Sequence, residues 1–367
     1  MRTWRSPGRV NLIGEHTDYN EGFCLPLAIA QGCNATVSVL DEPVLEVSST
    51  QRDRHVEVSW NELRPGALAD TDAWAGYALG VPWSLVQRGF TLPGLSIALD
   101  SDVPPGAGLS SSAALACSVA GAINDVTELG LERAELVSIS RQAENDFVGA
   151  PTGGLDQLVS VFGQADAVLL CDMRSLAVEP LAFDLNAAGL SLLVTDSRTP
   201  HQLSDGGYAE RRAACQEAAR ILGVAALREL SLEDLDDALS RLSSPVLRRR
   251  VRHVITENDR TVACAELLRT GQLSAVGPLL TASHVSLRDD YEVSVPPIDL
   301  AVEVMLAFGA CGARITGGGF GGCAIGLIDP GQARAAALSI KSAYSGRGYE
   351  PPRSFQAIPS AGLHRIM

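Results

Sequence analysis

The chain has 367 residues, of which 46% are hydrophobic and 20% are charged, so it can bury a sizeable core and is not a disordered protein. Its 43 acidic residues outnumber its 29 lysines and arginines, and the net charge of −14 argues against a protein that binds nucleic acid. Lys341 is the only lysine, which excludes a phosphate-binding loop of the Gly-Lys-Ser/Thr type and the protein-kinase pattern. If the protein uses a nucleotide, it must hold the phosphates without a lysine.

The apolar runs, cysteines and histidines narrow the class further. No run approaches the roughly eighteen apolar residues of a membrane helix, and the start of the chain has no signal-peptide core. The eight cysteines contain no Cys-x-x-Cys pair and the six histidines are dispersed, which predicts buried thiols in a reducing compartment instead of disulfides or a zinc site. We expect a cytoplasmic monomer that binds neither nucleic acid nor a membrane.

Polar and apolar residues alternate early in the chain, and helical spacing dominates later. In chain order, the predicted elements are strands at 35–39 and 55–58, a helix at 73–88, a strand at 95–99, helices at 110–124 and 132–148, a short helix after Gly154, strands near 167–170 and 190–195, and helices at 208–222, 246–268 and 333–344. This order predicts an α+β protein whose strand-rich domain covers residues 1–186 and whose more helical domain covers residues 187–367.

The first motif, residues 7–20, places polar groups densely around a short apolar strand. Glu15, His16 and Asp18 offer several hydrogen-bond acceptors within four residues, which suits the neighbouring hydroxyls of a sugar. A charged strand end followed by an Asx-type turn is the alternative that composition alone favours. The crowding of these groups and Arg9 into a segment that also contains a proline and two glycines weakens that alternative.

The second motif, residues 104–114, is a glycine loop that runs into a helix of small residues. Gly106 and Gly108 let the backbone approach a ligand closely, and the start of the helix presents unpaired N–H groups to an anion. Serine hydroxyls add donors, and one of them could ligate Mg²⁺ beside phosphates. An ordinary Ser-capped helix after a Pro-Gly turn is the alternative, but three successive serines behind Gly-x-Gly favour the anion site.

The third motif, residues 315–323, contains five glycines in six positions. Its match to Gly-x-Gly-x-x-Gly is a weak signal, because a dinucleotide fold would place it early and follow it with an acidic residue. We interpret it as a packing loop against the second motif. Between the two lie Glu144, late on a predicted helix, and Asp156, where a helix could start.

Together these segments resemble the galactokinase family, within the superfamily of galactokinases, homoserine kinases, mevalonate kinases and phosphomevalonate kinases. Residues 8–20 resemble that family's sugar motif nearly residue for residue, whereas residues 105–114 and 316–323 resemble loops shared by the superfamily. Three further segments stand in the family's order, at 74–77, 208–212 and 359–362. The resemblance therefore spans the chain.

The resemblance implies a two-domain kinase with the active site between the domains, which transfers phosphate from ATP, with Mg²⁺, to the anomeric hydroxyl of α-D-galactose in galactose catabolism by the Leloir pathway. It implies that Asp156 is the catalytic base and that Arg9 is its charged neighbour. The residues implied to bind the sugar are Glu15, His16, Thr17, Asp18, Gly153 and Tyr208. Those implied to bind the ATP phosphates are Gly106, Ala107, Gly108, Leu109, Ser110, Ser111 and Ser112, and those implied to ligate Mg²⁺ are Ser112 and Glu144.

Two departures from the family's pattern and two other functions are also considered. Residues 152–155 replace the family's commoner Cys-Gly-Ile-Met, and Asp196 stands where asparagine is frequent. A related kinase for N-acetylgalactosamine or L-arabinose is the nearest alternative. A non-catalytic galactose- and ATP-binding sensor is another, although the complete serine loop at 110–114 and the presence of Asp156 disfavour it.

Overall fold

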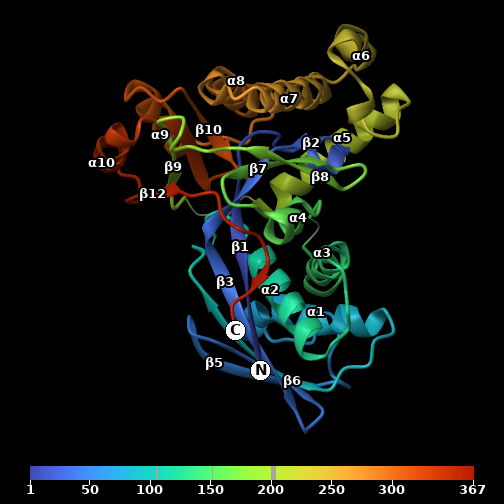
Figure 1. The fold of residues 1–367 in the computed structure, drawn as a ribbon. Helices are drawn as coiled ribbons and strands as arrows, with labels where there is room; N and C mark the ends of the chain where they lie inside the picture. Colours follow the sequence, from blue (N-terminus) through green and yellow to red (C-terminus); the bar gives the residue numbers. More distant parts are fainter. Residues whose placement is uncertain (105, 151, 200–203) are drawn as a thin grey trace.

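A computed structural model of the chain describes residues 1–104, 106–150, 152–199 and 204–367. Its largest sheet has six strands in the order β13-β1-β3-β6-β4-β5, with β4 parallel to β6 and the other pairs antiparallel. These strands are β1 (Arg2–Asn11), β3 (Pro26–Leu40), β4 (Val44–Ser49), β5 (Arg52–Ser59), β6 (Gly94–Ser101) and β13 (His364–Arg365). The long strands β1 and β3 cross much of the molecule, and the two chain ends lie together beside them (Figure 1). The first motif begins within β1 and continues past its end, so this sheet carries it.

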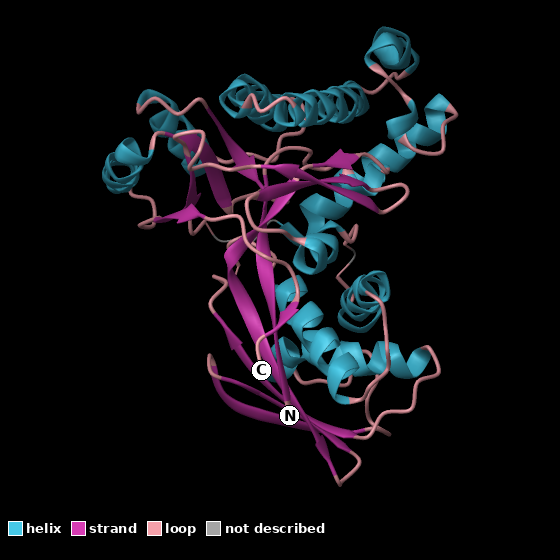
Figure 2. Cartoon of the chain, in the orientation of Figure 1, coloured by secondary structure: helices cyan, strands magenta, loops and turns pink. Residues whose placement is uncertain are grey.

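Helices cover one face of the six-stranded sheet, as Figures 1 and 2 show. They are α1 (Gly76–Gln87), α2 (Ser111–Val126), α3 (Arg133–Gln142) and α4 (Leu155–Phe162), and a short 3-10 helix (Asp70–Ala75) precedes α1. Small residues let α2 approach the sheet closely, since a Cβ at Gly121 would lie 2.9 Å from the ring of Trp4. The packing therefore places the start of α2 beside the end of β1.

The predicted helix at 132–148 is only partly an α-helix. It changes after α3 into a π-helix, Ala143–Val148, whose wider turn ends at Gly149 with φ of 84°. The Gly149 N–H donates to the Glu144 carbonyl five residues earlier, which is the bond that defines this turn. The spacing of apolar residues did not predict the extra residue in this turn. The π-helix carries Glu144.

The remaining strands form two smaller sheets. The four-stranded antiparallel sheet has the order β10-β11-β9-β12, and the three-stranded sheet has the order β2-β7-β8. The strands are β9 (Ser191–Asp196), β10 (Gly312–Thr316), β11 (Cys323–Ile328) and β12 (Arg353–Ala357) in the first, and β2 (Phe23–Cys24), β7 (Ala167–Asp172) and β8 (Ala177–Ala182) in the second. Because the third motif connects β10 to β11, it is fixed at one end of the four-stranded sheet.

Six further α-helices of the described part of the chain surround these smaller sheets. They are α5 (Ser204–Leu222), α6 (Leu235–Arg241), α7 (Pro245–Arg269), α8 (Gly277–Asp289), α9 (Pro296–Ala307) and α10 (Pro330–Arg347). Two buried apolar clusters result, one centred on the six-stranded sheet with α1–α4 and one on the four-stranded sheet with α5, α7, α9 and α10. The expected α+β architecture, strand-rich first and more helical later, is confirmed.

Candidate active site

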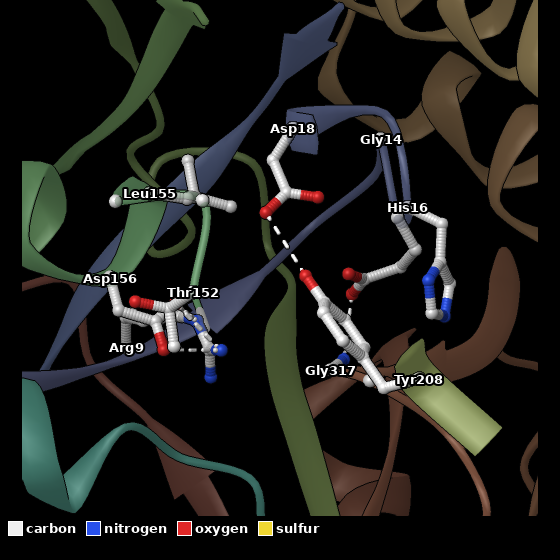
Figure 3. Close-up of a pocket in the computed structure, with 13 residues that line it drawn as sticks. Arg9, Gly14, His16, Asp18, Thr152, Leu155, Asp156, Tyr208 and Gly317 are labelled. Atoms are coloured by element: carbon white, nitrogen blue, oxygen red, sulfur yellow. Dashed lines mark hydrogen bonds and ion pairs between the residues drawn. The ribbon is translucent and has the colours of Figure 1, made fainter. Parts of the chain in front are cut away.

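A cavity of about 120 Å³ lies where the first motif, the start of α4, the start of α5 and the third motif meet. Its wall includes Arg9, Glu15, His16 and Asp18 from the first motif and residues 152–156 from the loop into α4. Tyr208 and two glycines of the third motif complete it (Figure 3). Segments that are distant in the sequence are thus brought together around a space whose wall carries several charged and polar side chains.

Asp156 and Arg9 form a two-point ion pair at one side of this cavity. The Arg9 Nε donates to Asp156 Oδ1 at 2.8 Å and Nη2 donates to Oδ2 at 3.0 Å. Arg9 Nη1 donates to the Gly108 carbonyl at 2.5 Å, and the Ser110 hydroxyl donates to Asp156 Oδ2 at 2.5 Å. Although burial disfavours the charged guanidinium, the carboxylates led by Asp156 hold the pKa of Arg9 above its usual value. The carboxylate is therefore fixed directly beside the second motif.

Glycines before α4 determine where Asp156 and Asp18 lie. Gly154 precedes α4 with φ of 95°, a left-handed conformation that few other residues adopt, and Asp156 follows in the first turn. A Cβ at Gly153 would lie only 2.2 Å from Asp18 Oδ2, so a larger residue there would displace that carboxylate. The Tyr208 hydroxyl donates to the same Asp18 oxygen at 3.4 Å (Figure 3). Burial raises the pKa of Asp18 to about 6.

Glu15 joins the first motif to the third. Its Oε1 accepts a hydrogen bond of 2.7 Å from the Gly317 N–H and one of 3.2 Å from the Thr316 hydroxyl. Arg314, whose side chain is fully buried, lies 3.6 Å from the same oxygen. Burial nevertheless raises the pKa of Glu15, against the effect of Arg314 and Arg9. The first and third motifs therefore form one connected wall of the cavity.

Thr17 is the predicted sugar-binding residue that does not line the cavity. Its hydroxyl is fully buried and lies 2.7 Å from the Phe23 carbonyl and 2.9 Å from the Gly14 carbonyl. These backbone acceptors turn the hydroxyl into the loop, away from the cavity, which differs from the expected contact with a sugar. Thr17 stabilises the loop that carries its neighbours.

Helix α7 supplies residues that the sequence analysis did not identify. The Glu257 carboxylate, fully buried, accepts hydrogen bonds from the Gly14 N–H at 3.0 Å and the Glu15 N–H at 3.3 Å. One turn earlier, His253 Nε2 lies 3.1 Å from the Glu15 carbonyl, and Asn258 Oδ1 accepts from the Phe23 N–H at 2.9 Å. The sequence signal that could have identified them is the presence of a carboxylate and an imidazole, Glu257 and His253, in a helix predicted to pack against the core.

The loop of the second motif turns through three residues with positive φ before α2 begins. Ser110 has φ of 59° and makes no side-chain cap bond to α2, because its hydroxyl is bonded to Asp156. The simple Ser-capped helix is therefore not observed. Gly106 and Gly108 both have φ of 72°, and the buried side chains of Ala107 and Leu109 face the core. In this arrangement the backbone N–H groups of the loop and of the start of α2 are available to bind a ligand.

The third motif packs against the second, as predicted. The Cys323 thiol donates to the Ala107 carbonyl at 3.0 Å, and a Cβ at Gly317 would lie 3.3 Å from the Gly108 carbonyl. Gly317 has φ of 86°, so a glycine here allows both the left-handed turn and the close approach to Gly108. The third motif therefore packs against the second motif and also donates a backbone hydrogen bond, from Gly317, to Glu15.

Glu144 lies beside the serines of the second motif. Its carboxylate is 4% exposed and accepts hydrogen bonds from the Gln157 amide and, at 3.4 Å, from the Thr152 hydroxyl. Burial and the charge of Asp156 raise the pKa of Glu144 to about 7, although a hydrogen bond with Ser112 acts in the opposite direction. A hydroxyl and a carboxylate are oxygen ligands of the kind that Mg²⁺ prefers, so the donor set fits this ion.

A second, larger cavity opens from the serine loop. It measures roughly 590 Å³, begins at Ser111 and Ser112, and extends to the aromatic rings of Trp74 and Tyr77. Leu99, Val103 and Leu115 contribute apolar surface. Aromatic faces next to an anion site suit a flat heterocycle attached to phosphates. The resemblance had placed 74–77 in the family's order without giving these side chains a role.

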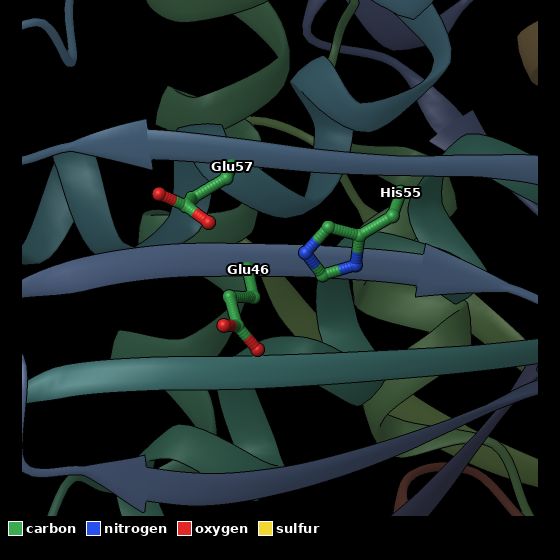
Figure 4. Close-up of side chains that lie close together, drawn as sticks. All are labelled: Glu46, His55 and Glu57. Atoms are coloured by element: carbon green, nitrogen blue, oxygen red, sulfur yellow. The ribbon is translucent and has the colours of Figure 1, made fainter.

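One other group of potential metal ligands lies elsewhere, on β4 and β5. Glu46 and Glu57 face each other across the strands, with His55 two residues before Glu57 (Figure 4). The ligand atoms of these three side chains lie within 4.8 Å of one another. None of the three lines either of the two cavities described above. In the described ranges, no helix has the length and apolar character to cross a membrane.

Three family models match the chain. The galactokinase galactose-binding signature matches residues 2–39, the GHMP kinases N terminal domain matches residues 77–164, and the GHMP kinases C terminal model matches residues 264–346. The first of these spans the first motif, and the second spans the serine loop, Glu144 and Asp156. The matches therefore fall on the segments that build the cavity.

Curated relatives and solved structures agree with these matches. The chain is 45% identical to a galactokinase of Streptomyces coelicolor, covering 99% of this chain and 94% of the relative, and 42% identical to one of Mycobacterium tuberculosis, covering 98% of each. A crystal structure of Lactococcus lactis galactokinase complexed with galactose superposes with a TM-score of 0.94 at 31% identity, covering 100% of this chain and 95% of that one. A mevalonate kinase of Methanococcus jannaschii shares the fold at a TM-score of 0.68 and 17% identity, covering 97% and 98%.

Proposed function

This chain belongs to the galactokinase family of the GHMP kinases and is an enzyme that phosphorylates galactose, and we propose that Asp156, paired with Arg9, is its catalytic base. The observation that carries the proposal is the fixed carboxylate at the wall of the cavity, where it is bonded to Arg9 and to Ser110 of the serine loop. In this arrangement Asp156 accepts the proton of the anomeric hydroxyl as the hydroxyl oxygen bonds to the terminal phosphorus of ATP. The bond from that phosphorus to the bridging oxygen breaks, and ADP leaves with that oxygen. Arg9 stabilises the charge that develops during this transfer.

The sugar occupies the cavity of Figure 3 in this proposal. The carboxylates of Glu15 and Asp18 accept hydrogen bonds from sugar hydroxyls, and Tyr208 and His16 close the space around the ring. Gly153 contributes by leaving room for Asp18. That a galactokinase of Lactococcus lactis was crystallised with galactose supports galactose as the occupant.

ATP occupies the loop at 106–112 and the second cavity. The exposed backbone and the positive end of α2 bind the phosphates, which explains how the chain works without a phosphate-binding lysine. Trp74 and Tyr77 hold the base in the larger cavity. Since phosphoryl transfer passes through a loose transition state, positioning by this loop contributes to the rate together with the base.

Magnesium is held by Ser112 and Glu144, directly or through water. When bound, Mg²⁺ would neutralise charge on the phosphates of ATP, which a chain with a net charge of −14 otherwise repels. Glu144 is suited to this because its described partners are neutral, so its charge is not already compensated by an arginine.

Asp156→Asn, measured for both galactose binding and turnover, tests the catalytic assignment. Turnover is expected to fall by about 10²–10⁴-fold, the usual share of a general base, while galactose still binds by isothermal titration calorimetry. Asp146→Asn is the matched control, since Asp146 is exposed on the π-helix and lines neither cavity. A thermal unfolding curve checks that Arg9, left without its charged partner, does not unfold the variant. Retained turnover would remove Asp156 from this role.

A panel of sugars separates galactose from the alternatives. Galactose is expected to be phosphorylated faster than N-acetylgalactosamine and L-arabinose, and release of ADP with formation of sugar phosphate excludes the sensor. Faster turnover of either other sugar would overturn the assignment of galactose as the preferred substrate.

The division into domains, the location and the oligomeric state of the protein are proposed as well. We place the domain boundary at 186/187, just before β9, although β13 returns to pair with β1. A cytoplasmic location is supported by eight cysteines that are all free thiols, seven of them buried. The predicted monomer and the predicted lack of nucleic-acid and membrane partners are testable by sedimentation and by binding assays.

A further inference from the structure

A chain of hydrogen bonds leads from the sugar cavity into the protein through His16. His16 Nδ1 lies 2.8 Å from the Tyr19 hydroxyl, which lies 2.8 Å from the Tyr291 hydroxyl, which lies 3.1 Å from the Cys215 sulfur. His16 lines the cavity and is 3% exposed, and within the described ranges its Nε2 has no hydrogen-bond partner. One ring nitrogen is thus held by the protein and the other is left for a ligand.

The hydrogen bonds from His16 to Cys215 can all be donated in one of two directions. In the first, the thiol donates to Tyr291, Tyr291 donates to Tyr19, and Tyr19 donates to Nδ1, which puts the ring proton of His16 on Nε2. In the second, Nδ1–H donates to Tyr19 and each bond reverses, which leaves the thiol proton unused. Every bond has one proton in both cases, so the choice depends on the two ends.

The two ends differ in strength. Imidazole nitrogen is a good acceptor for a phenol, whereas thiol sulfur is a weak one, so the first direction ends on the better acceptor. The second direction would also take the Cys215 thiol proton out of this series of hydrogen bonds, so that the thiol would turn to the Asn20 side chain, which also interacts with it. The first direction uses every proton of the series and leaves only Nε2–H, at the cavity.

We propose that Tyr19 is a positioning residue that donates to Nδ1 and fixes His16 as the tautomer with its proton on Nε2, so that His16 presents a hydrogen-bond donor to the sugar. This inference rests on the proposed function for the identity of the sugar, but the tautomer itself does not depend on it. Glu15 and Asp18 supply acceptors to the same cavity, so a donor complements them. A sugar hydroxyl can then donate to a carboxylate and accept from His16.

Other observations agree with a neutral, fixed ring. Burial, with repulsion from His253 and Arg211, lowers the pKa of His16 to about 3, so the ring carries one proton at neutral pH. Burial also holds the pKa of Tyr19 and that of Tyr291 well above the usual value, so both keep the proton that they donate.

The surroundings of the ring limit its orientation. The ring centroid of His16 lies 4.7 Å from that of Tyr291 and 5.6 Å from that of Tyr208. The backbone of Gly318 raises the pKa of the ring, although it makes no hydrogen bond of normal geometry with Nε2.

Nitrogen NMR of the protein labelled with ¹⁵N-histidine measures the tautomer directly, before any sugar is added. The protein has only six histidines, and the His16 signals are assigned by their loss in His16→Asn. The expected result is a protonated Nε2 and an unprotonated Nδ1. His253 provides an internal reference, because its Nε2 lies 3.1 Å from the Glu15 carbonyl and must carry the proton there.

Two tyrosine variants then test the role of Tyr19. Tyr19→Phe is expected to convert His16 to a mixture of tautomers and to raise the KM for galactose about three- to tenfold, the value of one hydrogen bond, with a smaller change in kcat. Tyr344→Phe is the matched control, since Tyr344 is also buried and donates to the Pro297 carbonyl at 2.6 Å, but lies on α10. It is expected to leave both the tautomer and the KM unchanged.

The outcomes distinguish this inference from the proposed function. A proton on Nδ1 of wild-type His16, or an unchanged tautomer in folded Tyr19→Phe, would overturn the inference even if galactose is phosphorylated. If Tyr19→Phe does not fold, the wild-type spectrum still decides. A protonated Nε2 in a protein that does not bind galactose would instead refute the sugar assignment and leave the tautomer standing.

Discussion

Replacing Glu257 with glutamine tests whether a buried charge on α7 holds the sugar motif in place. The Glu257 carboxylate accepts from the N–H groups of Gly14 and Glu15 and from the Ser283 hydroxyl at 2.7 Å, and it pairs with Arg260 at 2.9 Å. Glutamine has nearly the same shape but no charge. The substitution therefore removes the electrostatic part of these contacts without opening a cavity.

The expected loss follows from the pKa of this carboxyl. Burial alone would raise the pKa of Glu257, but Arg260, His253 and Arg314 lower it from the usual 4.5 to about 2. Since each pKa unit corresponds to about 1.4 kcal/mol, the ionised side chain contributes about 3 kcal/mol to the free energy of unfolding at neutral pH. A carboxylate whose pKa is lower when folded stabilises the protein above pH 4.5, and this contribution disappears as the pH falls towards 2.

Urea unfolding at pH 7 and at several lower pH values measures this contribution. Glu257→Gln is expected to lose about 3 kcal/mol at pH 7, with a smaller difference from wild type at each step below pH 4.5. Glu266→Gln is the matched control, because Glu266 lies on the same helix, is exposed, and pairs with Arg269; its change is expected to stay within about 0.5 kcal/mol. The KM for galactose is also expected to rise in Glu257→Gln, since Gly14 and Glu15 lose a charged acceptor.

Either of two results would refute the reasoning. One is a loss of stability at pH 7 no larger than that of Glu266→Gln. The other is a loss that stays constant as the pH falls below 4.5, because a protonated Glu257 and a glutamine carry the same charge.

Three other substitutions probe the cavities. Gly153→Ala is expected to displace Asp18 and lower kcat/KM for galactose by about tenfold or more, whereas Gly346→Ala, with open space around its position on α10, leaves it unchanged. Asp18→Asn is expected to increase the free energy of unfolding at pH 8 by up to about 3 kcal/mol, with no gain below pH 4. Burial raises the pKa of Asp18 from 3.8 to about 6, so its negative charge destabilises the folded protein as the pH rises. The KM for galactose is expected to increase in the same variant. Trp74→Ala is expected to raise the KM for ATP about tenfold and leave the KM for galactose unchanged, and equal changes in both would argue against the second cavity as the nucleotide site.

The sequence was informative wherever chemistry and local spacing coincide. Gly154 could be expected to precede a helix that carries Asp156, since this depends on a short segment. The two-domain α+β architecture followed from the order of the alternating and helical stretches.

Contacts between distant segments could not be predicted in this way. The hydroxyl of Ser110 bonds to Asp156, 46 residues away, so the cap that local sequence suggested does not form. Thr17 lies in the sugar motif but bonds to the loop backbone, because its rotamer depends on where Phe23 lies. Glu257 and His253 are 242 and 238 residues from Glu15, and only the folded chain shows that they support it.

The bonds that α7 and the third motif make to the sugar motif determine when the site can exist during synthesis. Glu15 is held by Glu257 and by the Gly317 N–H, so its surroundings are incomplete until most of the chain has been made. The serine loop, α2 and Asp156 all precede residue 160 and are synthesised far earlier. A growing chain therefore contains the serine loop and Asp156 for much of its synthesis without the contacts that surround Glu15, and the cavity between them is completed only near the end of translation.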